Sequence, residues 1–287
     1  MRHFEFHQPR TLKEASNLLG RLGPGAMVYA GGTDIIPRTR LKRLHPDHLV
    51  NIKRIPGLSG VQRKGNTLTI GALTTFNDII FSDVVNSNLP ILAEVARTIA
   101  SHQVRNLATI GGNLCNAAPS ADSAPILIAL GAALSVCSPR GKRRVLLEDF
   151  FKGPGRPNLK RGEIVTHVLL KKPRPTVGCA YMKHKIRQSL EIAITGVAVA
   201  LDFAGGECRD ARVIVGACAP TPVRARQAES LLKGSALGAQ DLAAAADAVR
   251  KEISPIDDVR GSAEYRREMT ALCLKRAAEI AVRRCGK

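Results

Sequence analysis

Ala30-Gly31-Gly32-Thr33-Asp34 is the stretch around which the rest of the chain is organised. It closes an apolar run, Met27-Val28-Tyr29-Ala30, that has the composition of a buried strand. Two adjacent glycines let the backbone adopt positive φ and let a ligand approach bare N–H groups, as a phosphate oxygen requires. A single Gly-Gly pair is nevertheless more often an ordinary tight turn.

A second glycine pair follows further along the chain, in Thr109-Ile110-Gly111-Gly112-Asn113. Like the first, it is followed by a short polar residue. Because a pyrophosphate has two anionic groups, two such turns that converge from different parts of the chain would clamp it mostly through main-chain donors. The two turns together therefore predict a diphosphate-binding site.

The composition limits the classes of function. With 287 residues, the chain is long enough for one large domain or two modest ones. The net charge of +19 suggests a nucleic-acid-binding protein, but the basic residues are dispersed and aromatic residues make up only 3% of the chain. Because few rings are available to stack on exposed bases, a solvated basic surface or one that meets acidic partner subunits is the favoured interpretation.

The sequence also predicts a cytoplasmic protein without a metal. No segment approaches the roughly 18 apolar residues of a membrane span, and the N-terminus has no signal-peptide core. The seven cysteines are scattered and form no Cys-x-x-Cys pair. We therefore predict reduced thiols, with Cys115 as a small buried residue.

The pattern of apolar residues and breakers predicts two lobes, about 1–57 and 58–175, and a third unit over 176–287. Pro173 and Pro175 mark the linker. The second lobe is expected to contain a helix over 126–134 and a strand over 164–170. The last unit is expected to contain strands within 178–183, 192–203 and 211–217 and a final helix over 263–284.

The loop after the second turn, 116–125, consists largely of small and polar residues between two prolines. Such a segment is usually only a loop, but directly after a phosphate clamp it can also wrap a cofactor. Asp122 in this loop is suited to accept a hydrogen bond from a ribose or ribityl hydroxyl.

The order of four motifs resembles the FAD-binding medium subunit of molybdenum hydroxylases, including those of aerobic carbon monoxide dehydrogenase and bacterial xanthine dehydrogenases. The motifs are AGGTD over 30–34, RNxATIGGN over 105–113, NAxPxxDxAP over 116–125 and Tyr181-x-Lys183-x-x-x-Arg187. The segment 216–224 also resembles part of the family's C-terminal domain. The resemblance spans essentially the whole chain.

The resemblance implies an α+β fold. A two-lobed FAD-binding domain of the PCMH or vanillyl-alcohol-oxidase type precedes a small domain made of a three-stranded antiparallel sheet with helices. It also implies a molybdopterin-binding large subunit and a small subunit with [2Fe–2S] clusters as partners, in a dimer of heterotrimers. In this scheme electrons pass from the clusters through FAD to an external acceptor.

Residue by residue, the resemblance implies that two segments lie against the FAD pyrophosphate and neighbouring atoms. They are Tyr29, Ala30, Gly31, Gly32, Thr33, Asp34 and Ile35, and Thr109, Ile110, Gly111, Gly112 and Asn113. Asp122 would contact the polar part of the cofactor, Val165 would meet it through its main chain, and Lys183 would lie near it. Lys183 can also be interpreted as a surface lysine on a strand. No catalytic residue is assigned, because flavin electron transfer needs no dedicated base on this subunit.

Two features distinguish the chain from some relatives. Its compact 113–125 loop has no room for the cysteine-rich [4Fe–4S] insert of certain members, and Thr33-Asp34 stands where a His-Ser pair is expected in the carbon monoxide enzymes. The residues alone also allow a free-standing FAD oxidoreductase or a basic nucleic-acid-binding protein. The substrate and the electron acceptor stay open.

Overall fold

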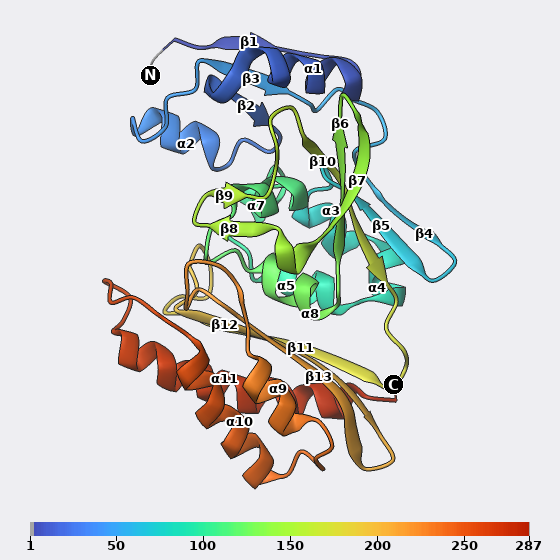
Figure 1. The fold of residues 1–287 in the computed structure, drawn as a ribbon, viewed down its shortest axis with the longest axis vertical. Helices are drawn as coiled ribbons and strands as arrows, with labels where there is room; N and C mark the ends of the chain where they lie inside the picture. Colours follow the sequence, from blue (N-terminus) through green and yellow to red (C-terminus); the bar gives the residue numbers. More distant parts are fainter. Residues whose placement is uncertain (1–2, 287) are drawn as a thin grey trace.

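The computed structural model describes residues 3–286, which form an N-terminal lobe, a second lobe and a C-terminal domain along the long axis of the molecule (Figure 1). No helix within these residues combines the length and the apolar character that a membrane crossing requires.

The N-terminal lobe is a parallel sheet of three strands in the order β1-β3-β2. Thr11 caps its first long helix by accepting a hydrogen bond from the Glu14 N–H at 3.1 Å, and Ala15 and Leu19 of that helix lie in the lobe's core. The elements are β1 (Glu5–His7), α1 (Leu12–Leu22), η1 (Gly23–Gly25), β2 (Ala26–Tyr29), α2 (Ile35–Arg40) and β3 (His48–Asn51).

The second lobe contains an antiparallel sheet in the order β4-β5-β10-β6-β7, with short helices that contribute to the same apolar core. Its strands are β4 (Val61–Lys64), β5 (Thr67–Gly71), β6 (Ala133–Ser138), β7 (Gly141–Leu146) and β10 (Ile164–Lys171), with the small pair β8 (Phe151–Gly153) and β9 (Arg156–Pro157). Its helices are α3 (Phe76–Phe81), α4 (Asp83–Asn88), α5 (Ile91–Arg97), α6 (His102–Arg105), α7 (Ile110–Asn116), α8 (Ser123–Ala129) and η2 (Leu147–Asp149).

The helix expected over 126–134 is wrong in both bounds. Helix α8 begins at Ser123 and ends at Ala129, and Leu134 belongs to β6. Gly131 has φ +68°, a left-handed conformation that glycine adopts without strain and that ends the helix. The apolar run therefore continues into strand β6, of which Leu134 and Val136 are buried, and the run 126–134 alone does not distinguish this strand start from a helix.

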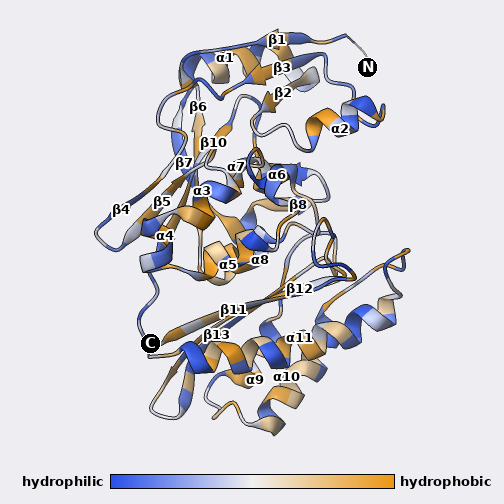
Figure 2. Ribbon diagram, turned by 180° about the vertical axis from the view of Figure 1, so that it is seen from behind, coloured by the Kyte–Doolittle hydropathy of each residue, from blue (hydrophilic) through white to orange (hydrophobic). Residues whose placement is uncertain are grey.

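The C-terminal domain is an antiparallel sheet, β11-β12-β13-β14, whose two-residue fourth strand was not expected from the sequence. Helices α9 to α11 cover one face of this sheet, and the second lobe lies on the other side (Figure 2). On that other face, Cys179, Ala198, Ala200 and Ile214 belong to the core of the second lobe. The elements are β11 (Val177–His184), β12 (Thr195–Ala204), β13 (Glu207–Gly216), β14 (Val223–Arg224), α9 (Arg226–Leu232), α10 (Ala239–Glu252) and α11 (Ala263–Arg284).

Candidate FAD site

The first glycine turn packs directly against the chain that enters the second. A Cβ atom on Gly31 would lie 2.2 Å from the carbonyl oxygen of Leu107 and 3.1 Å from Cα of Ala108. A Cβ on Gly112 would lie 3.9 Å from Cβ of Ala30. The two turns, far apart in the sequence, therefore converge in space, and only glycine fits at position 31.

Tyr29 and Gly32 set the shape of the first turn. Gly32 has φ +80°, and a Cβ there would lie 2.7 Å from Cε2 of the Tyr29 ring. The same ring also lies 5.9 Å from the Phe6 ring, centroid to centroid in a T-shaped arrangement, and Nζ of Lys53 lies 4.7 Å from its centroid. The Tyr29 ring thus folds back over its own turn. Because Gly32 has no Cβ, it leaves room for this ring.

The first turn keeps its main-chain donors open. Among the hydrogen bonds within residues 3–286, none uses the N–H groups of Gly31, Gly32 or Thr33. Open N–H groups in a turn with positive φ form the kind of concave nest that binds anions.

The second turn differs from the expectation, because it is the first turn of helix α7, with Thr109 as the N-cap, and its main-chain N–H groups already have partners inside the protein. The N–H groups of Ile110 and Gly111 donate to the carbonyls of Thr74 and Ala72 at 3.0 and 2.9 Å. Those of Gly112 and Asn113 donate to Thr109, to its Oγ1 at 3.1 Å and to its carbonyl at 2.9 Å. The second turn therefore offers none of these four N–H groups to a ligand, and the first turn packs beside it. The open N–H donors lie on the first turn.

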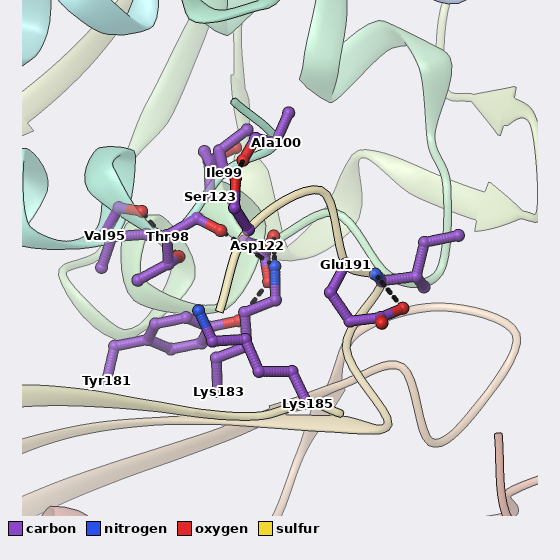
Figure 3. Close-up of polar contacts among 12 residues, drawn as sticks. Val95, Thr98, Ile99, Ala100, Asp122, Ser123, Tyr181, Lys183, Lys185 and Glu191 are labelled. Carbon is purple, nitrogen blue, oxygen red and sulfur yellow. Dashed lines mark hydrogen bonds and ion pairs between the residues drawn. The ribbon is translucent and has the colours of Figure 1, made fainter. Parts of the chain in front are cut away.

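Asp122 and Lys183 form a buried ion pair between the second lobe and the C-terminal domain (Figure 3). Lys183 Nζ lies 2.8 Å from Asp122 Oδ2 and also donates to the carbonyl of Thr98 at 3.0 Å. Tyr181 donates its hydroxyl proton to Asp122 Oδ1 at 2.8 Å. Because the Lys183 side chain is only 2% exposed, its interpretation as a surface lysine is wrong.

Burial governs the protonation of this group. Loss of solvent raises the pKa of Asp122, and the Lys183 ammonium partly offsets that shift. Burial, together with the Asp122 carboxylate, raises the pKa of Tyr181 well above its usual value. Tyr181 therefore stays a neutral hydrogen-bond donor at physiological pH.

Hydrogen bonds connect two other predicted residues, Asn113 and Val165, or their sequence neighbours, to this part of the site. Ser123 donates its hydroxyl proton to Asn113 Oδ1 at 2.6 Å, which links the second turn to the residue after Asp122. Val165 is buried in β10, next to Thr166, whose carbonyl accepts the N–H of Ala72 at 2.8 Å. The carbonyl of Ala72 in turn accepts the N–H of Gly111.

The remaining motif residues are Asp34 and Arg187, which are exposed, and Ile35, which is half-buried. Ile35 is the first residue of α2, preceded by the exposed Asp34. Arg187 lies in the exposed loop between β11 and β12, where it pairs with Glu191 at 2.8 Å rather than with another domain. Cys115 was expected to be buried, and it is half-buried against the core of the second lobe. Burial raises the pKa of its thiol to about 12, so the thiol stays neutral.

The contact of Tyr181 with Asp122 was not predicted from the sequence, although Tyr181 stands two residues before Lys183 in the same motif. Alternate residues of a strand point to the same face, so period two in β11 was an available signal. The pairing of Tyr181 with Asp122 cannot be recognised in the sequence, because it depends on how the two domains dock.

A cavity of about 820 Å³ lies elsewhere, between the second lobe and the C-terminal domain, and none of the predicted site residues lines it. Among its lining residues are Lys64, Arg144, Lys171 and Arg212. The candidate FAD site is instead formed by the two turns, with the buried Asp122 group linked to the second turn through the hydrogen bond from Ser123 to Asn113. Its open N–H donors and its glycine at positive φ fit a diphosphate cofactor.

Comparisons with known proteins agree with this fit. Residues 2–173 match the model of the FAD binding domain in molybdopterin dehydrogenase, and residues 180–281 match that of the CO dehydrogenase flavoprotein C-terminal domain. The chain is 37% identical over 283 residues to the carbon monoxide dehydrogenase medium chain of Hydrogenophaga pseudoflava, covering 99% of this chain and 98% of the relative. It is 34% identical to the xanthine dehydrogenase FAD-binding subunit of Escherichia coli O157:H7, covering 98% and 97%.

A solved structure shows the same fold. A chain of carbon monoxide dehydrogenase from Hydrogenophaga pseudoflava, in a form that lacks the Mo-pyranopterin moiety, superposes with a TM-score of 0.97 at 38% identity and covers 99% of both chains. The chain therefore belongs to the family of FAD-binding subunits of molybdopterin dehydrogenases and has both of the family's domains.

Proposed function

We propose that this chain binds FAD and serves as the electron-transferring subunit of a molybdenum hydroxylase, between the [2Fe–2S] clusters of a partner and an external acceptor. The observation that supports this most directly is the first glycine turn. It packs against the segment that enters the second turn, and its N–H groups at Gly31, Gly32 and Thr33 have no partner within residues 3–286. When bound, FAD supplies the redox chemistry, and the protein supplies binding and orientation.

In this proposal the first turn, Tyr29 to Ile35, donates main-chain N–H groups to the diphosphate, and Thr109 to Asn113 shape the opposite wall. Asp122, Lys183 and Val165 complete the set, with Asp122 held in place by Lys183 and Tyr181. Residues 1–175 form the FAD-binding domain and 176–287 the C-terminal domain. No residue of this chain is assigned a catalytic proton transfer.

We further propose that the partners are a molybdopterin-binding large subunit and a [2Fe–2S] small subunit, in a dimer of heterotrimers. Relatives named for carbon monoxide and for xanthine are about equally similar to this chain, which fits a subunit that does not touch the substrate. All seven cysteines are free thiols, which supports function in the cytoplasm.

The test is an FAD titration of the full chain and of Gly32→Asp, followed by flavin absorbance and fluorescence. Asp at position 32 places a carboxylate and a Cβ where φ is +80° and the Tyr29 ring is 2.7 Å away, so we expect FAD affinity to fall at least about tenfold. Gly205→Asp is the matched control, because Gly205 has φ +66° and open space around it.

Two results would contradict the proposal. One is equal FAD affinity of Gly32→Asp, Gly205→Asp and the unchanged chain. The other is absence of flavin from the endogenous assembly, combined with tight, strongly salt-dependent binding of duplex DNA, which would favour the nucleic-acid alternative.

A further inference from the structure

Three metal-ligating side chains meet on β1 and β3 of the N-terminal lobe. His7 Nε2 lies 3.2 Å from His48 Nδ1. Glu5 Oε2 lies 3.5 Å from His7 Nε2 and 3.4 Å from His48 Nδ1. We propose that Glu5, His7 and His48 form a binding site for Zn²⁺ or a similar divalent transition-metal ion.

The sheet geometry explains why these residues meet. Glu5 and His7 are two apart on β1, so their side chains leave the same face. His48 on β3 is the register partner of Glu5 in the parallel ladder, which places its side chain on that face as well. The cluster is thus built into the sheet and does not depend on a loop conformation.

The size of the cluster fits a tetrahedrally coordinated metal ion. The three separations are nearly equal and outline one face of a tetrahedron. With zinc–nitrogen and zinc–oxygen bonds of about 2.0–2.1 Å, the edge of such a tetrahedron is about 3.3–3.4 Å. An ion just outside the plane of the three atoms would reach all of them, and its fourth position would be left for water.

A hydrogen bond between the two imidazoles explains the cluster less well than a bound metal ion does. A proton on one of the two facing ring nitrogens lies along a single edge of the triangle, whereas a metal ion interacts with all three atoms at once. The imidazoles are 24% and 21% exposed and the Glu5 carboxylate is 64% exposed, so an ion has access from solvent. Two imidazoles and a carboxylate suit zinc and its neighbours, whereas magnesium and calcium prefer oxygen ligands only.

Such an ion would act on the lobe's structure. Strand β1 has only three residues and lies at the edge of its sheet, where β3 is its only partner strand among residues 3–286. A metal bridge between β1 and β3 would hold it in register. The proposal is independent of the FAD site, and its test uses no flavin.

The experiment uses the untagged full chain after removal of metal by a chelator. Zn²⁺ affinity is measured by competition with a chromophoric chelator, and Co²⁺ is titrated to read the coordination geometry from its visible spectrum. We expect one ion per chain, a tetrahedral Co²⁺ spectrum, and affinity at least about tenfold weaker in His7→Gln, His48→Gln and Glu5→Gln. Mg²⁺ should not compete.

The control is His45→Gln, which removes an exposed histidine close to β3 but outside the cluster. Zn²⁺ should raise the melting temperature of the unchanged chain and of His45→Gln by a few degrees. It should not do so in His48→Gln, whose folding is checked by circular dichroism. Equal Zn²⁺ affinity in all variants, or an octahedral Co²⁺ spectrum, would overturn the proposal.

Discussion

Gly31 and Gly20 show how one residue type serves two purposes. Gly20 lies in α1, where a Cβ would meet nothing within 4 Å apart from its own helix backbone, whereas a Cβ on Gly31 would lie 2.2 Å from the Leu107 carbonyl oxygen. Neither has a positive φ. At position 31 glycine is therefore required by close approach of two backbones and not by conformation.

Gly31→Ala should consequently separate the two turns and weaken FAD binding at least about tenfold, because the obstructing atom belongs to the backbone and has little freedom to move. Gly20→Ala should leave FAD binding unchanged and stabilise α1 by about 0.5–1 kcal/mol. Isothermal titration with FAD and urea unfolding measure the two effects. FAD affinity of Gly31→Ala equal to that of Gly20→Ala would refute the packing argument.

At the scale of elements, an ion pair joins β7 to the start of β10 across the intervening β6. Arg143 donates from Nε and a terminal nitrogen to the two Glu163 oxygens, both at 2.7 Å, and Glu163 also accepts the N–H of Lys160. The hydrogen bonds from Arg143 lower the pKa of Glu163 below its usual 4.5.

A lowered native pKa gives a definite sign to the pH dependence. The pair contributes stability above the pKa of the unfolded chain and loses it as pH falls through the lower native value. Glu163→Gln should therefore be about 1–2 kcal/mol less stable at pH 7, and the difference should shrink in acid. Urea unfolding from pH 7 to pH 3 tests this, with the exposed Glu207→Gln as the control, whose curve should follow that of the unchanged chain.

Periodicity predicted the elements that have clear ends and a single exposed face. The final helix occupies 263–284 as expected, with Ser262 as its N-cap. The boundary between α8 and β6 was missed, because the segment 124–134 that spans it is almost entirely apolar and Gly131 at positive φ separates the two elements. Strand β14 was missed because two residues give no period.

The same limit applies to the candidate FAD site and to the metal cluster. Glycine pairs are visible in the sequence, but the partners of the Ile110 and Gly111 N–H groups, which are the carbonyls of Thr74 and Ala72, come from elsewhere in the lobe. The spacing of the cysteines predicted no metal. His7 and His48 are 41 residues apart, and only the β1–β3 register brings them together.

At the scale of the whole molecule, the C-terminal domain is joined to the second lobe by apolar and polar contacts together. Ala198, Ala200 and Ile214 lie in the core of the second lobe, and the Asp122–Lys183 ion pair lies at the same junction. Arg284 of α11 adds a more exposed pair with Glu94 of α5 at 3.0 Å.

Lys183→Met should destabilise the chain by about 3–5 kcal/mol, because it leaves the Asp122 carboxylate buried without its cation. The pKa of Asp122, already raised by burial, should rise further. A raised native pKa stabilises below the unfolded pKa and loses that effect as pH increases, so the variant should be relatively most stable in acid.

The double variant Lys183→Met with Asp122→Asn removes the unpaired charge and should recover part of the loss. Urea unfolding followed by circular dichroism and by hydrogen exchange in both domains measures these effects. If Lys183→Met unfolds only the C-terminal domain, the shared core is not cooperative and this account of the junction fails.

The shared core also sets a rule for exchanging parts between relatives. Family boundaries fall between 173 and 180, which invites a chimera cut at the linker. However, β12 and β13 pack on α8 of the other domain, so a transplanted C-terminal half would meet a foreign α8. A graft that also carries residues 122–129 from the donor keeps the helix, the buried aspartate and the receiving sheet face matched.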